Sequence, residues 1–372
     1  MGTVSSYATT EGKRYRVRYR KPDNAQTDKR GFKTKREAEL FLSSVEVAKA
    51  RGEFIDGTAA RAQIGVLGPV WLKHQGHLKP SSLLPLEVAW RLYVEPRWST
   101  VPVADVRHSD VQSWVMDMSA KRGATTVIRA YGVLASIMDG AVKDRRILSN
   151  SARGVNLPRK VTKPHAYLTP QQVSDLSVAA GDHGTLLLVL AYTGLRWGEA
   201  VALRVKDLDM LRRRANVTTN AVEVNNRIEV GTPKSHKRRS VPFPATLAPA
   251  LAKACEGKAR EDLVFAGASG SYLRRAKTDA GWFGVAVKRA GLPRMTLHDL
   301  RHTAASLAVS SGANVKAVQR MLGHASASMT LDVYADLFED DLDEVAGRLD
   351  HLLISTDVGR MWARSGNSVN LN

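Results

Sequence analysis

Six side chains in the second half of the sequence are of types that could act together on a phosphate group. In chain order they are Arg196, Lys234, His298, Arg301, His324 and Tyr334. Two arginines can bind phosphate oxygens through planar guanidinium groups, a geometry that lysine cannot match. A tyrosine hydroxyl can form a phosphate ester when a neighbour takes its proton, and a lysine can protonate a departing sugar oxygen. The set therefore predicts phosphoryl transfer on a nucleic-acid backbone.

The local context of each residue places it near the end of an element. Arg196 follows a helix-ending Thr193-Gly194 pair, and Lys234 lies in a Thr-Pro-Lys-Ser turn between strands. His298 and Arg301 are three residues apart at the start of a helix, so both project from one face. We find no acidic cluster that would hold Mg²⁺, so we expect no metal or other cofactor, with arginines and histidines stabilising the charge instead.

Two other functions fit parts of this pattern. His298 and His302 are four residues apart, as in the zinc helix of metallohydrolases, but the glutamate base of that motif is replaced by Asp299. Arg301 would also place positive charge beside the metal. A DNA-binding regulator without catalytic activity fits the composition, but binding alone does not require a tyrosine at this spacing. The complete set therefore favours an enzyme.

Composition indicates an anionic partner. The 372 residues carry a formal net charge of +19, which is typical of proteins that bind nucleic acid or an anionic surface. The longest apolar run, residues 186–192, is far shorter than the roughly 20 residues of a membrane span. The N-terminal residues lack the apolar core of a signal peptide and match a myristoylation pattern only loosely. A single cysteine, Cys255, fits a reducing cytoplasm, and we expect no membrane association.

The first 57 residues show a separate basic pattern. Four arginines alternate with Tyr15, Val17 and Tyr19, a period of two that places the arginines on one face of a strand. These are Arg14, Arg16, Arg18 and Arg20. Thr34 and Glu37 form a capping box that opens a helix over residues 35–51. We expect a small sheet with a supporting helix, whose arginine face binds DNA phosphates.

The rest of the chain divides at two small or basic linkers. Residues 58–65 and 154–165 are predicted linkers, and residues 66–153 between them carry helical apolar stripes. From residue 166 the pattern is mixed: a buried helix ends near Gly194, and three strands are expected at residues 215–219, 222–230 and 239–243. The predicted fold class is multidomain and mainly α, with a small α+β N-terminal domain, a helical domain and a mostly helical domain containing a three-stranded sheet.

These motifs resemble those of the tyrosine recombinase, or phage integrase, family, over essentially the whole chain. Arg196 stands in the Leu-x-x-Gly-Glu context, in which Glu199 matches the family's supporting acidic position. His298 and Arg301 match the His-x-x-Arg box, and His324 matches the Leu-Gly-His position. Lys234 matches the β-hairpin lysine and Tyr334 the nucleophile. The sequence is most similar to integrases of temperate mycobacteriophages.

The resemblance implies a specific activity and organisation. Residues 1–57 would bind arm-type DNA sites, residues 66–153 would bind core-type sites, and residues 166–372 would be catalytic. Tyr334 would form a 3′-phosphotyrosyl intermediate in a homotetramer that exchanges strands through a Holliday junction. The reaction would integrate phage DNA into the host chromosome. A host DNA-bending protein is an expected partner, and a phage directionality factor would allow excision. The C-terminal seam Phe338, Leu342, Val345, Leu349 and Leu352 would link protomers, although packing on its own domain fits it almost equally well.

Overall fold

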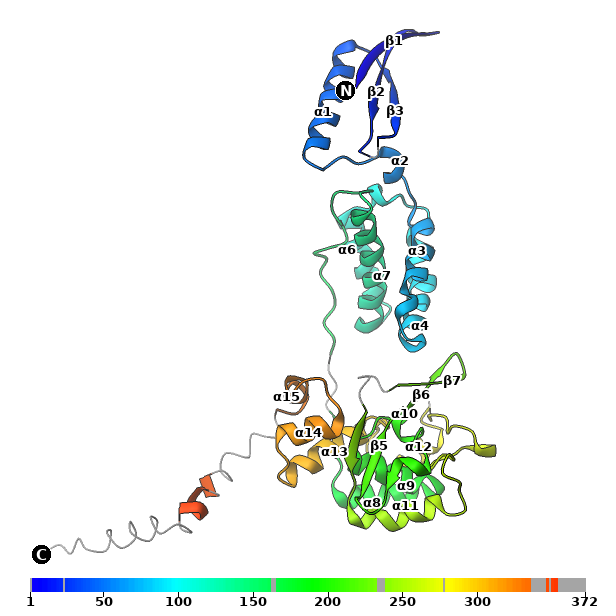
Figure 1. Ribbon diagram of the computed structural model, residues 1–372, viewed down its shortest axis with the longest axis vertical. Coiled ribbons are helices and arrows are strands. Elements are labelled where there is room, and N and C mark those ends of the chain that lie inside the picture. The colour runs from blue at the N-terminus through cyan, green and yellow to red at the C-terminus, as the bar shows by residue number, and fades with distance from the viewer. Residues whose placement is uncertain are drawn as a thin grey trace, which may run out of the picture. The chain divides into compact units, whose positions relative to one another are not determined.

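The chain forms two compact units, Met1–Thr162 and Lys163–Asn372 (Figure 1). The structure is a computed structural model. It describes residues 2–22, 24–161, 165–232, 238–276, 278–335, 346–347 and 349–353. The boundary between the units falls inside the predicted linker at 154–165. Further division of the first unit at residues 58–65 stays a prediction, and a short helix, α2 (Gly57–Ala60), lies at its start.

The N-terminal part is an antiparallel sheet with one helix. The strands β1 (Thr3–Thr9), β2 (Gly12–Arg20) and β3 (Gln26–Phe32) pair in that order, and α1 (Lys35–Ala50) begins at the Thr34–Glu37 capping box. Val17 is fully buried, and the Tyr19 ring packs edge-on against Phe41 of α1 at 5.9 Å between ring centroids. The apolar face of β2 therefore packs on α1. The alternating arginines project from the opposite face of the central strand, as the period of two predicts.

The helical remainder of the first unit has its own apolar core. Its elements are α3 (Ile64–Lys73), α4 (Pro80–Ala89), α5 (Glu95–Trp98), α6 (His108–Ser119) and α7 (Ala124–Lys143). The predicted stripe of α7 is buried, with Leu134 and Met138 fully enclosed. The rings of Trp98 and Trp114 meet at right angles, 5.8 Å apart, which is a favoured aromatic geometry.

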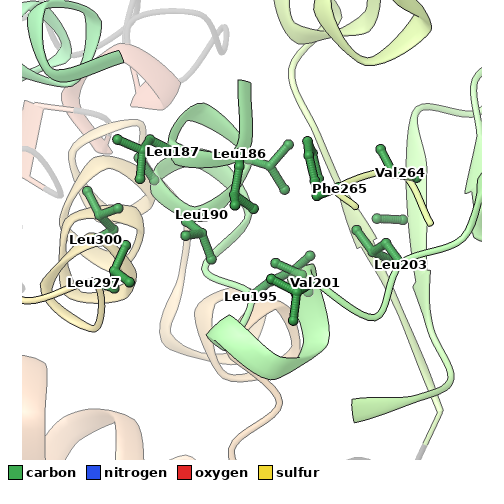
Figure 2. Packing of buried hydrophobic residues seen from close by; sticks show 14 of the residues in the cluster. Leu186, Leu187, Leu190, Leu195, Val201, Leu203, Val264, Phe265, Leu297 and Leu300 are labelled. Atoms are coloured by element: carbon green, nitrogen blue, oxygen red, sulfur yellow. The ribbon is translucent and has the colours of Figure 1, made fainter. Parts of the chain in front are cut away.

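The second unit is built around one buried helix, α9 (Gly184–Thr193). Its leucines Leu186, Leu187 and Leu190 are each 1% exposed and pack with residues from several other segments (Figure 2). Since α9 is apolar on all sides, it must be surrounded by other elements to be stable. The helices that pack on it are α8 (Pro170–Ala179), α10 (Trp197–Ala200), α11 (Ala248–Cys255) and α13 (Asp299–Ser310). Outside these, α12 (Trp282–Arg289) packs on α8, α14 (Val315–Leu322) packs on α13, and α15 (Ser328–Tyr334) packs on α14.

The sheets of the second unit differ in one respect from the prediction. A three-stranded sheet has the order β4 (Leu208–Asp209), β5 (Arg214–Val217), β8 (Arg239–Pro242). The prediction of a single strand over 222–230 is wrong. That segment forms a separate hairpin of β6 (Asn220–Val224) and β7 (Arg227–Gly231). Asn225 and Asn226 both have positive φ, 48° and 61°, which a type I′ hairpin turn requires and which asparagine tolerates.

The C-terminal seam lies largely outside the described residues. Phe338, Leu342 and Val345 are not among them, whereas Leu349 and Leu352 are helical and 55% and 62% exposed. Within the part of the chain that the structure describes, no helix is both long and apolar enough to cross a membrane.

Candidate active site

The site begins where α9 ends. Gly194 adopts the left-handed conformation, with φ of 62°, and a β-carbon there would lie 2.5 Å from a methyl carbon of Leu322. Glycine is therefore required both by the backbone and by the close approach of α14. The chain then turns into α10, with Arg196 as its N-cap residue. This turn fixes Arg196 at the edge of the buried core, where its side chain is 26% exposed.

Glu199 holds Arg196 in place. Its carboxylate accepts a hydrogen bond from the Arg196 backbone N–H at 2.9 Å and another from the Arg196 guanidinium at 3.0 Å. The same carboxylate receives both terminal nitrogens of Arg239, at 2.9 and 2.6 Å. Burial opposes the ionisation of Glu199, but the hydrogen bonds and charges of Arg239 and Arg196 outweigh it and hold its pKa below the usual value. Glu199 is therefore an ionised carboxylate between two guanidinium groups.

Arg301 connects the ends of α9 and α14. It is 4% exposed, and its guanidinium donates to the Gly194 carbonyl at 2.5 Å and to the Leu322 carbonyl at 2.6 Å. Burial and the nearby charge of Arg196 lower its pKa to about 9, so it remains a cation at neutral pH. His298, one turn earlier at the start of α13, is exposed, and burial of part of its ring together with Arg301 lowers its pKa. The buried cation of Arg301 next to the exposed His298 ring favours the binding of an anionic ligand.

His324 follows the left-handed turn that ends α14. Its Nδ1 lies 3.0 Å from the Thr330 hydroxyl, and its backbone carbonyl accepts from Gln319 at 3.2 Å. Partial burial, and then the positive charges of Arg301, Arg196 and Arg239, lower the pKa of His324 to about 4. The imidazole is therefore neutral at pH 7, and its position is set from both sides.

Tyr334 ends α15 inside this group. The residue is 2% exposed, and its hydroxyl lies 2.8 Å from Nδ1 of His302, which is itself 7% exposed. Burial raises the pKa of Tyr334 to about 12, and burial followed by the neighbouring histidines lowers the pKa of His302 to about 4. The pair is a neutral phenol and a neutral imidazole, in which the hydroxyl donates when the imidazole carries its proton on Nε2. The His302 ring is stacked on His165 at 3.7 Å between centroids.

The structure thus brings five of the predicted residues into one unit and around one centre: Arg196, His298, Arg301, His324 and Tyr334. Glu199 contacts the first of them. Lys234 lies outside the described residues. Arg14, Arg16, Arg18 and Arg20 belong to the other unit. The sequence indicated no role for Arg239 beyond the start of a strand, and it indicated His302 only as a zinc ligand or as the residue after the His-x-x-Arg box. His302 is the residue directly after Arg301, whereas Arg239 ends a basic run five residues after Lys234, which was the available signal.

One group of described residues could hold a metal ion. Possible ligand atoms of His165, Asp299 and His302 lie within 4.8 Å of one another. The His165 and His302 rings are stacked with 21° between their planes, so their nitrogen lone pairs do not converge on one point. An Asp299 oxygen already accepts from the Thr296 N–H and hydroxyl, at 2.6 and 2.8 Å. These residues as they stand do not fit a tetrahedral zinc site.

Comparison with known proteins identifies the second unit. Residues 166–340 match the phage integrase family. The chain belongs to this family through that segment. It is 28% identical to a putative prophage phiRv2 integrase of Mycobacterium tuberculosis, over 88% of this chain and 87% of that protein. It is 27% identical to tyrosine recombinase XerC of Anoxybacillus flavithermus, over 64% of this chain and 80% of that protein.

A solved structure agrees with these relatives. A fragment of the Tn1549 transposon integrase, in complex with transposon right-end DNA, aligns with a TM-score of 0.66 and 26% identity. The alignment covers 77% of this chain and all of that fragment. The integrase chain described here is a tyrosine-type site-specific recombinase with a mostly helical, multidomain fold. The family resemblance and the fold class expected from the motifs are confirmed.

Proposed function

We propose that Arg196, His298, Arg301, His324 and Tyr334 form the active site of this integrase, with Tyr334 as the nucleophile. The observation that carries the proposal is the enclosure of the Tyr334 hydroxyl. It meets a neutral imidazole at 2.8 Å, and a buried arginine acts on it electrostatically. A tyrosine that only packed in a core would not need a cation and a hydrogen-bonding base beside it.

Charge balance supports phosphate as the ligand. Arg196, Arg239 and Arg301 bring three guanidinium groups to the site, and Glu199 is the carboxylate that contacts two of them. This leaves an excess of positive charge at a partly buried place, which a phosphodiester would neutralise. Arg196 and Arg301 would bind the non-bridging oxygens, and His298 and His324 would donate hydrogen bonds to the charge that develops in the transition state.

The proposed reaction forms one phosphoester bond for each one that it breaks. The Tyr334 oxygen attacks the scissile phosphate and its proton passes to Nδ1 of His302, the neutral imidazole at 2.8 Å, while the bond from phosphorus to the 5′ oxygen breaks. Lys234 protonates the departing 5′ oxygen, which leaves a 3′-phosphotyrosyl link. The 5′-hydroxyl of a second duplex then attacks this link and releases Tyr334. Because the phosphotyrosyl bond retains the energy of the broken phosphodiester, neither ATP nor another cofactor is required.

The proposed DNA partners follow the division of the chain. Residues 66–153 and 166–372 would hold double-stranded core-type sites, and residues 1–57 would bind arm-type sites through the arginine face of β2. On that face Arg16 lies opposite Ser5 and Arg30, and Arg18 lies opposite Thr3 and Asp28. Asp28 is paired with Arg30, and the other side chains are cations and short hydroxyl groups, which suit contacts with DNA phosphates and base edges.

We further propose a homotetramer that joins phage and bacterial attachment sites through a Holliday junction. A host DNA-bending protein would assist integration, and a phage directionality factor would allow excision. The C-terminal segment that contains Leu349 and Leu352 would pack on a neighbouring protomer, which would bury the exposed faces of both side chains.

A suicide substrate tests the active site directly. A core-site duplex with a nick close to the scissile phosphate loses its short 5′ fragment after cleavage, so the covalent intermediate accumulates. We expect a protein–DNA adduct on a denaturing gel, and mass spectrometry of the digested adduct should place the 3′-phosphate on Tyr334. An adduct on a different residue, or cleavage that leaves no adduct, would contradict the proposal.

A further inference from the structure

Arg239 makes more polar contacts with its side chain than its place in a strand requires. It opens β8 and pairs with Val217 of β5, and its side chain is 10% exposed. Its two terminal nitrogens bind the two oxygens of Glu199, a bidentate geometry that fixes the relative orientation of both groups. Since Glu199 also binds the backbone and side chain of Arg196, the position of Arg196 depends on Arg239 through one carboxylate.

Arg239 also contacts the loop that presents His324. Its Nε donates to the Met321 carbonyl at 3.3 Å. Gly323, with φ of 67°, lies directly against the guanidinium, since a β-carbon there would be 2.9 Å from Nε and 3.0 Å from Cζ. The left-handed turn before His324 therefore packs directly against the Arg239 side chain.

We propose that Arg239 is a positioning residue for recombination, which sets Arg196 through Glu199 and sets His324 through the turn at Gly323. This inference rests on the proposed function, because it assigns both targets to phosphate binding. Arg239 itself does not contact the reacting atoms. Its role is to fix the distance between two phosphate-binding groups that come from segments more than 120 residues apart in the chain.

The alternative is an ion pair that only stabilises the fold. A buried ion pair contributes little net stability, because desolvation of both charges offsets their attraction. The contacts to Met321 and Gly323 are also directed at the loop of His324 and not at the hydrophobic core. An arginine that only balanced the charge of Glu199 would not need them.

The main test separates cleavage from DNA binding. In Arg239→Ala we expect the rate of adduct formation in pre-formed DNA complexes to fall about 100-fold, the size expected for a misplacement near 1 Å. Arg239→Lys keeps the charge but not the planar fork, and we expect an intermediate loss of about tenfold. DNA affinity should stay within about threefold in both variants. Arg204, which pairs with the exposed Glu261 at 2.7 Å, is the matched control, and Arg204→Ala should cleave at the normal rate.

Two further measurements probe how Arg239 acts. Added guanidinium ion should restore part of the cleavage rate of Arg239→Ala, because it can fill the vacated place between Glu199 and Gly323. In the same variant the pKa of the His324 ring, followed by NMR, should rise, because one of the cations that lower it has gone. The pKa change reports only that the charge of Arg239 reaches His324, whereas a merely destabilised protein would not regain its cleavage rate with guanidinium. If Arg239→Ala folds poorly, the double variant Arg239→Gln/Glu199→Gln replaces it, because it removes both buried charges together. This double variant should fold, and its rate of adduct formation should remain low.

The outcomes also separate this inference from the proposed function. If the unchanged protein forms its adduct on Tyr334 and the Arg239 variants cleave at the normal rate, the inference about Arg239 is wrong and the proposed function stands. If the unchanged protein forms no adduct on Tyr334, the proposed function itself fails. Loss of activity with no guanidinium rescue would show that Arg239 supports only the fold.

Discussion

Replacement of Tyr334 by phenylalanine has two separable consequences. The ring packs among Val318, Leu322 and neighbouring side chains, and phenylalanine retains that packing. The hydroxyl disappears, so Nδ1 of His302 loses its partner at 2.8 Å in a place where both residues are at most 7% exposed. A buried polar atom left without a partner costs about 1–3 kcal/mol. We therefore expect Tyr334→Phe to unfold with a free energy lower by about that amount, and to form no covalent adduct.

The assays for this variant are a suicide-substrate gel, a gel-shift titration with a core site and urea unfolding. DNA affinity should be unchanged, because no proposed phosphate-binding residue is altered. Tyr192→Phe, on the half-buried side of α9, is the matched control and should form the adduct normally. An adduct of normal yield with Tyr334→Phe would refute the assignment of the nucleophile. An unchanged free energy of unfolding would instead refute the buried hydrogen bond to His302.

Three further predictions concern other parts of the chain. The pKa of His302 is about 4 in the folded protein and about 6.5 when exposed, so the unfolded chain binds more protons between these pH values. The free energy of unfolding should therefore fall as pH falls through this window, by at most about 3 kcal/mol. Urea unfolding at pH 7.5 and at pH 5 should show a weaker pH dependence in His302→Gln. Deletion of residues 1–57 should spare cleavage of a core-type suicide substrate but abolish integration on a full phage site, and an isolated segment 1–57 with no sequence preference at moderate salt would reduce the arginine face to a non-specific anchor. Truncation after Asp336 should weaken synapsis more than single-site binding, measured by gel shift, and equal assembly of recombining complexes would show that the segment only packs within its own domain.

The residues of the candidate site were predictable where chemistry and local structure coincide. Arg196 follows a glycine that ends a helix, and His298 and Arg301 share one helical turn, so their types and spacing carry the information. The alternating arginines of β2 were predictable for the same reason, since a strand places every second residue on one face.

Contacts between distant segments were not predictable in this way. Glu199 binds Arg239 across 40 residues, and Tyr334 binds His302 across 32 residues. No local pattern indicates which of several nearby basic residues will meet a given carboxylate or hydroxyl. The hairpin of β6 and β7 was missed for a different reason: Asn225 and Asn226 signal a turn, but the apolar alternation on either side reads as one continuous strand.

The two hydrogen bonds from Arg301 to backbone carbonyls make the proposed anion site depend on folding. The same side chain that would bind the scissile phosphate also ties together the ends of α9 and α14, 107 and 21 residues away in the chain. Its cation is therefore held in place only after these segments have met. A full-length but partly unfolded chain would still carry every residue of the proposed active site, but it would lack the assembled anion site. The proposed cleavage activity should therefore be confined to chains in which the second unit has folded.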